Sequence, residues 1–204
     1  KIPFTYDSLK EEPAIIREET APYMYSAREY DAKDIENLSE WARAELINGK
    51  LYMLSAPNRL HQYFVKGLVF EIESFIRKNK GKCHVYASPF DVRLFGDAST
   101  IVQPDILVVC SRDILTEKGC SGAPDWVIEI VSRSNSSHDY VRKLMQYQKA
   151  GVREYWIVDP FQELISVFNF EDAGKSAQYG YSEAVPSGVL EGLAVCFGEM
   201  MEGY

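Results

Sequence analysis

The most constraining feature of the sequence is a pair of short apolar segments separated by one amphipathic stretch. Residues 126–131 read WVIEIV, and residues 154–159 read EYWIVD. Runs that are apolar on both faces are typical of central strands covered by helices. Between them, residues 134–151 carry Ser and Asn at the start and glycine at the end, as helices do. Residues 126–159 therefore predict a strand–helix–strand unit in an α/β sheet with helices on both faces.

The rest of the chain adds strands and one long helix to this unit. Asn48-Gly49 predicts a hairpin within ELINGKLYML, because both turn positions need positive φ. Apolar residues recur at helical spacing after Pro57 and predict a helix to about residue 79. The other expected elements are a helix at 27–42 that can break near residue 38, strands at 83–88, 90–95 and 101–110, a loop at 111–124, a hairpin around 171–176, and a closing strand with a helical turn after residue 189.

The 204 residues suit one domain, and a hydrophobic content of 46% is close to the globular average. We expect residues 1–25, which contain three prolines, to form an irregular N-terminal extension and residues 26–204 to form a single domain. No apolar run approaches the length of a membrane span, and the N-terminus lacks the regions of a signal peptide.

Charge and cysteine usage exclude some classes of protein. A net charge of −8 argues against a non-specific nucleic-acid coat protein, but allows an enzyme that meets nucleic acid through a local basic patch. The four cysteines form no CxxC pair and their spacings fit no zinc site. They predict free thiols in a cytoplasmic protein.

Two acidic residues lie in apolar surroundings. Glu129 is alone among valine and isoleucine neighbours, and Asp105 follows Pro104 at the entrance to the apolar run 106–109. A buried, unpaired carboxylate needs a metal, a cation or an altered pKa. Two such groups on adjacent strands would repel each other, and a divalent cation between them, Mg²⁺ or Mn²⁺, removes the conflict. The alternative is that Asp105 caps a turn and Glu129 pairs with an arginine or lysine.

The helix predicted after Glu129 offers a third element of a site. Asp139, Lys143 and Tyr147 recur at a spacing of four and share one face of that helix. Lys143 could point back over the strand ends toward Glu129. The alternative is an ordinary surface ion pair between Asp139 and Lys143.

Glu45 and His61 also have two interpretations each. Glu45 begins the first strand of the hairpin, where it could be a mere strand-edge charge. His61 lies on the apolar stripe of the long helix, where a histidine is more often a packing residue than a ligand. The sequence contains no GxxxxGK[ST], GxGxxG, GxSxG or HExxH motif, which removes the usual nucleotide-binding, hydrolase and metalloprotease motifs.

Five blocks of the sequence carry a resemblance to a known family. They are ELINGKLYMLSAPNRLHQ, FDVRL, QPDILVVC, GAPDWVIEIVS and KLMQYQKAGVREYWIVDP. Together they resemble the Uma-type family of putative restriction endonucleases, in the PD-(D/E)xK nuclease superfamily, over about residues 40–170. The resemblance implies a restriction-endonuclease-like α/β fold, in which a central mixed β-sheet is flanked by helices on both faces and holds a metal site at one end.

The resemblance also implies which positions form that site. Pro104-Asp105 matches the Pro-Asp element, and Glu129 matches the acidic residue of the (D/E)xK element. Glu45 matches the glutamate of the ELI-x-G block, and His61 matches a frequent histidine at the start of the long helix.

One position departs from the superfamily pattern. The superfamily lysine, two residues after the acid, would fall on Val131. An apolar residue there is common in the family, whose lysine is placed on the following helix. Lys143 is the matching position.

By this resemblance, Mg²⁺ or Mn²⁺ would be held by Asp105, Glu129 and the backbone carbonyl of Ile130. Glu45 would support a second metal or a water on the metal. Lys143 would position the attacking water or offset charge at the scissile phosphate. The products would carry 5′-phosphate and 3′-hydroxyl ends.

Three functions are compatible with these observations. The first is a metal-dependent endonuclease in the cytoplasm that hydrolyses DNA phosphodiester bonds, without membrane contact and as a homodimer. The second is a catalytically inactive nuclease-fold module that binds nucleic acid or protein, which the acidic pI and Val131 favour. The third is metal-dependent hydrolysis of another phosphodiester. Sequence specificity would come from loops such as 111–125 or from dimer formation.

Overall fold

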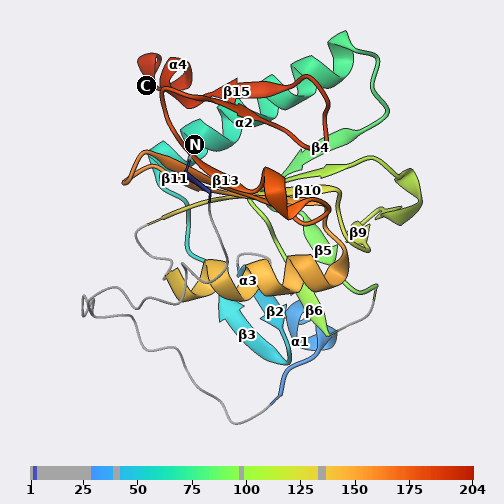
Figure 1. Ribbon diagram of the computed structural model, residues 1–204. Helices are drawn as coiled ribbons and strands as arrows, with labels where there is room; N and C mark the ends of the chain where they lie inside the picture. Colours follow the sequence, from blue (N-terminus) through green and yellow to red (C-terminus); the bar gives the residue numbers. More distant parts are fainter. Residues whose placement is uncertain (1, 4–28, 39–41, 97–98, 133–136) are drawn as a thin grey trace.

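A central mixed sheet organises the molecule. The computed structural model describes residues 2–3, 29–38, 42–96, 99–132 and 137–204 (Figure 1). Seven strands form the central sheet in the order β1-β13-β12-β11-β10-β7-β4. These strands are β1 (Ile2–Pro3), β4 (His84–Ala87), β7 (Ile106–Val109), β10 (Trp126–Ile130), β11 (Glu154–Asp159), β12 (Leu164–Asn169) and β13 (Ala177–Gly180).

A second, six-stranded sheet has the order β3-β2-β6-β5-β9-β8, and β14 pairs with β15 in a separate ribbon. The strands are β2 (Ala44–Ile47), β3 (Lys50–Met53), β5 (Asp91–Arg93), β6 (Thr100–Val102), β8 (Leu115–Thr116), β9 (Gly119–Ser121), β14 (Ala184–Pro186) and β15 (Ala194–Cys196). The helices are α1 (Ala32–Glu36), α2 (Arg59–Lys78), α3 (Ser137–Ala150) and α4 (Phe197–Glu202), with short 3-10 turns η2 (Arg112–Ile114) and η3 (Ala173–Lys175).

Successive side chains of β10 point to opposite faces of the central sheet, and this determines which helix each face contacts. Trp126, Ile128 and Ile130 pack in one core cluster with the buried stripe of α2. Val127 packs in a second cluster with residues of α3, and Glu129 points to this same side because strand side chains alternate. Helices α2 and α3 therefore cover opposite faces of the sheet (Figure 1). This is the predicted mixed α/β architecture, and β10, α3 and β11 form the predicted strand–helix–strand unit with a parallel strand pair.

The predicted hairpin and long helix are also present. Asn48 and Gly49 have φ of 50° and 73° in the turn between β2 and β3. Asn58 caps α2, because its side-chain oxygen accepts from the backbone N–H of His61 at 2.9 Å. Local signals sufficed for both elements, since a turn residue and a helix cap act within a few positions.

Three segments differ from prediction. The expected helix at 27–42 is only the five residues of α1, because Asp31 caps its start and Asn37 its end, while residues 27–28 and 39–41 lie outside the described residues. The expected loop at 111–124 contains η2 and the hairpin β8–β9, which pairs with β5. Gly119 allows this pairing, because a Cβ there would lie 2.1 Å from the carbonyl oxygen of Asp91. The predicted closing strand and helical turn are β15 and α4, but the sequence patterns did not predict that β15 pairs with β14.

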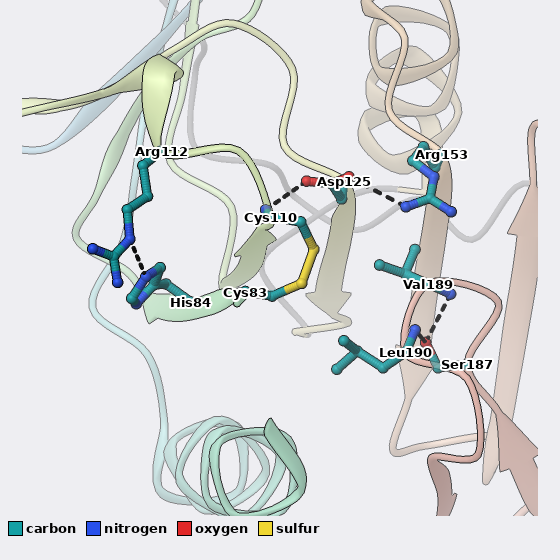
Figure 2. Close-up of a disulfide and its surroundings, with 9 residues drawn as sticks. All are labelled: Cys83, His84, Cys110, Arg112, Asp125, Arg153, Ser187, Val189 and Leu190. Atoms are coloured by element: carbon teal, nitrogen blue, oxygen red, sulfur yellow. Dashed lines mark hydrogen bonds and ion pairs between the residues drawn. A yellow bond between two sulfur atoms is a disulfide. The ribbon is translucent and has the colours of Figure 1, made fainter. Parts of the chain in front are cut away.

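The cysteine prediction is wrong for one pair. Cys83 and Cys110 form a disulfide (Figure 2), whereas the other two cysteines are free thiols. The register of β4 on β7 pairs His84 with Val109, so the next residues outward are the two cysteines. Strand register, and not their spacing of 27 residues, brings them together. Cysteine usage therefore does not argue for a reducing compartment.

The N-terminal extension is described only at residues 2–3, which pair with β13 as β1. Residues 4–28, which include most of the predicted extension, lie outside the described residues. Among the helices in the described parts of the chain, none combines the length and apolar character needed to cross a membrane.

Candidate active site

Antiparallel pairing of β7 with β10 brings Asp105 and Glu129 to the same end of the central sheet. Ile106 lies opposite Ile128, so one further step of the register places Asp105 opposite Glu129. Asp105 Oδ2 accepts a hydrogen bond from the backbone N–H of Ile130 at 2.8 Å. The two acidic side chains thus lie on adjacent strands, as a shared ion requires.

Helix α3 supplies two side chains to the carboxylate of Glu129. Lys143 Nζ lies 3.0 Å from Glu129 Oε1, and the hydroxyl of Tyr147 donates to the same oxygen at 2.9 Å. Lys143 is only 4% exposed, so it is not the surface lysine of the alternative interpretation. The side chain of Asp139, its partner in that interpretation, lies outside the described residues.

The second sheet supplies Glu45, which is 1% exposed and therefore is not a solvated strand-edge charge. Its Oε1 accepts from Lys143 Nζ at 2.8 Å and from the backbone N–H of Gln103 at 2.9 Å. One lysine is therefore shared by two buried carboxylates from different sheets. This arrangement joins β2, β10 and α3 at one point.

His61, in the first turn of α2, contacts Asp105 and does not serve only as packing. Its Nε2 lies 2.9 Å from Asp105 Oδ2, and among the described residues its buried Nδ1 has no hydrogen-bond partner. Asp105, Glu129, Lys143 and His61 together line a cavity of about 220 Å³. Glu45 and Tyr147 do not line this cavity but form hydrogen bonds with Lys143 and Glu129, which do.

Two carboxylate oxygens at the cavity are available to bind a hard divalent cation such as Mg²⁺. Among the described residues, no three His, Cys, Asp or Glu side chains are grouped closely enough to form a metal site by themselves. Asp105 and Glu129, however, each use one oxygen in the hydrogen bonds above, and their other oxygens have no partner within the described part of the chain. Mg²⁺ commonly takes one or two carboxylates and completes its shell with water. The third predicted ligand, the carbonyl of Ile130, accepts a long hydrogen bond of 3.4 Å from the Tyr140 hydroxyl.

Electrostatics also favours a cation here. Among the described residues around the cavity, three carboxylates face the two cations Lys143 and Arg43, so one negative charge is left over when all three carboxylates are ionised. Burial raises the pKa of Glu129 from 4.5 to about 8; Lys143 opposes this shift, and Asp105 and Glu45 add to it. Burial and the nearby Glu129 carboxylate raise the pKa of Tyr147 well above its usual range, so its hydroxyl remains a donor.

A second buried carboxylate shows what a purely structural acid looks like in this fold. Glu154 is 1% exposed, and both of its oxygens are occupied. Oε1 accepts from Trp156 Nε1 at 3.0 Å and from Ser187 Oγ at 3.5 Å, while Oε2 accepts from the Gly188 N–H at 2.8 Å and from Asn169 Nδ2 at 3.3 Å. Glu129 differs because, among the described residues, its second oxygen has no such partner, and because its side chain lines a cavity.

Two residues of the site were not predicted. Arg43 lines the cavity, and its Nε donates to Gln103 Oε1 at 3.0 Å. Their positions beside predicted site residues could have identified both. Arg43 stands two residues before Glu45, on the same side of the strand, and Gln103 immediately precedes Pro104-Asp105.

Comparisons with known proteins agree with this fold. The Uma2 family model, described as putative restriction endonuclease, matches residues 29–195. The crystal structure of a putative nuclease belonging to DUF820 from Anabaena variabilis ATCC 29413 matches with a TM-score of 0.69 and 23% sequence identity, over 84% of this chain and 97% of that chain. At this identity the likeness shows the fold. The comparison with curated proteins finds no match. The resemblance and the fold class expected from the sequence are confirmed.

The raised pKa of Glu129 predicts a pH-dependent stability difference between the metal-free protein and Glu129→Gln. The folded state binds this proton more tightly than the unfolded chain, so the stabilisation by Glu129 is complete below about pH 4.5 and is lost as the pH rises to about 8. Urea unfolding in EDTA should therefore show Glu129→Gln gaining stability relative to wild type across this window. The exposed control Glu71→Gln should show no such trend. A difference for Glu129→Gln that does not change with pH would contradict the burial argument.

Proposed function

The chain belongs to the Uma2 family of putative restriction endonucleases, and we propose that it is a metal-dependent endonuclease that hydrolyses DNA phosphodiester bonds. One observation carries the proposal: the buried carboxylate of Glu129 leaves one oxygen without a described partner, beside Asp105 at the wall of a cavity. A structural acid such as Glu154 has no such oxygen.

In this proposal, Mg²⁺ or Mn²⁺ would neutralise charge at the phosphate and lower the pKa of a coordinated water. Asp105 and Glu129 would hold the cation through their second oxygens, with the carbonyl of Ile130 as a third donor. His61 and the Ile130 N–H already bind the first oxygen of Asp105 and so fix the orientation of that carboxylate.

Lys143 would stabilise the negative charge that develops on the phosphate. Its position between Glu45 and Glu129 holds the ammonium beside the cavity without exposing it to solvent. Glu45 would keep Lys143 in this position, and Tyr147 would orient Glu129. Such prepositioned charge is effective because the buried site needs little reorganisation during the reaction.

The proposed partner is DNA, and the proposed location is the cytoplasm. A homodimer would present two such sites, one for each strand of a duplex. The inactive nuclease-fold module remains the second candidate, because Val131 replaces the superfamily lysine and the described residues contain no preassembled group of three metal-binding side chains.

The first test is cleavage. Wild type should cut DNA with Mg²⁺ or Mn²⁺, leave 5′-phosphate ends, and lose activity in EDTA. Asp105→Asn and Glu129→Gln should each lower the rate at least about a hundredfold, because they remove proposed ligands. The exposed control Asp113→Asn should cut normally.

Thermal unfolding tests whether the site binds a cation, and binding and cleavage assays then separate the candidate functions. The cation should raise the melting temperature of wild type, since it binds only the folded state, and Glu129→Gln should lose that rise. DNA binding without cleavage would favour the inactive module. Cleavage of small phosphodiesters without cleavage of DNA would favour a different substrate.

Lys143→Ala should lower the cleavage rate by about a hundredfold or more. Calorimetry should show that divalent-cation affinity is kept or increased, because the variant loses the ammonium that competes for the charge of Glu129. Lys143→Arg should not restore full activity, since a planar guanidinium cannot replace a compact ammonium in this buried position. Val131→Lys in the Lys143→Ala background should recover part of the rate.

The control for this series is Lys149→Ala, which removes an exposed lysine from the same helix and should leave cleavage unchanged. Full activity of Lys143→Ala would remove Lys143 from the mechanism.

A further inference from the structure

Arg43 is the second cation at the cavity, and the chemistry proposed above gives it no task. It lies directly before β2 and lines the same cavity as Asp105 and Glu129. Strand pairing with the β3 side extends one residue before the start of β2, because Leu54 N–H donates to the carbonyl of Arg43 at 2.8 Å. Arg43 therefore faces the same side as Glu45, two residues along the chain.

Neutral groups hold the guanidinium of Arg43. Its Nε donates to Gln103 Oε1 at 3.0 Å, and Nη2 donates to Ser88 Oγ. Within the described residues, no carboxylate forms an ion pair with it, whereas Lys143 is shared by two carboxylates. An anion that enters the cavity would therefore meet a positive charge that is not already compensated by a direct partner.

The two partners of Arg43 connect it to the acidic residues. The backbone N–H of Gln103 donates to Glu45 Oε1 at 2.9 Å, and the backbone N–H of Ser88 donates to the carbonyl oxygen of Asp105 at 3.0 Å. Each partner thus contacts Arg43 through its side chain and an acidic residue through its backbone. This arrangement fixes the guanidinium relative to the carboxylates, which a mobile surface arginine would not allow.

The start of α2, another part of the cavity lining, also favours an anion. Asn58 and His61, the cap and first turn of α2, line it. The N-terminus of a helix of 20 residues carries partial positive charge and backbone N–H groups. Arg43 and this helix end thus line the same cavity as Asp105 and Glu129.

We propose that Arg43 binds a backbone phosphate of DNA next to the phosphate that is cut. Guanidinium has five N–H donors, of which Gln103 and Ser88 take two, so the remaining fork can bind two phosphate oxygens. This assignment rests on the proposed function, because it names the substrate group that orients DNA over Asp105 and Glu129.

The test is binding of a fluorescent 12-base-pair DNA duplex, measured by anisotropy at several salt concentrations in EDTA and in Ca²⁺. Arg43→Gln should weaken binding by about tenfold, as expected for a hydrogen bond to a charged group. It should also reduce the slope of log affinity against log salt by roughly one. Arg43→Lys should keep the slope but bind more weakly than wild type, since it retains the charge and loses the fork.

Arg77→Gln is the matched control, because it removes an exposed arginine from the far end of α2 and should change neither quantity. Three binding results would overturn the inference. They are no DNA binding by wild type in either buffer, wild-type affinity of Arg43→Gln, and weaker binding with an unchanged salt slope, as expected if Arg43 only braces Gln103 and Ser88. Cleavage is measured separately on the same variants. Binding that depends on Arg43 without any cleavage would refute the proposed function alone, and normal cleavage by Arg43→Gln would refute this inference alone.

Discussion

A buried lysine shared by two carboxylates is the interaction on which the site depends. Lys143 extends from α3 and lies 2.8 Å from Glu45 and 3.0 Å from Glu129, which belong to different sheets. Removing one member of such a group leaves a buried charge without its partner, which is strongly destabilising. The ion pairs therefore hold two sheets and a helix in one arrangement and place three charged groups beside a cavity.

Among the described residues around the cavity, three carboxylates face only two cations. Asp105 and Glu129 use one oxygen each for protein contacts, and burial favours a proton on Glu129 when no cation is present. A divalent cation would replace that proton and relieve the repulsion between neighbouring acids. Glu154 shows that this fold can satisfy a buried acid completely with neutral donors. Among the described residues Glu129 keeps one oxygen without a hydrogen-bond donor, which suits a site that binds a ligand.

Much of the fold and part of the site follow from local sequence. The apolar run around Glu129, the Asn48-Gly49 turn and the long helix after Pro57 each depend on residues close in sequence, and all appear where expected. The contact between Glu45 and Lys143 joins residues 98 positions apart, and only the assembled sheets reveal it.

Long-range register accounts for the rest. The disulfide arises from the pairing of β4 with β7, and the hairpin β8–β9 folds because β5 provides a neighbouring strand. The orientation of Arg43 depends on Gln103 and Ser88, which come from two other segments.

A crystal structure of the protein soaked in Mn²⁺, with anomalous scattering to locate the ion, tests the central claim most directly. We expect one peak at about 2.1 Å from an oxygen of Asp105 and an oxygen of Glu129, as for Mg²⁺ sites. A cavity without a peak, at Mn²⁺ concentrations that saturate the thermal shift, would contradict the account.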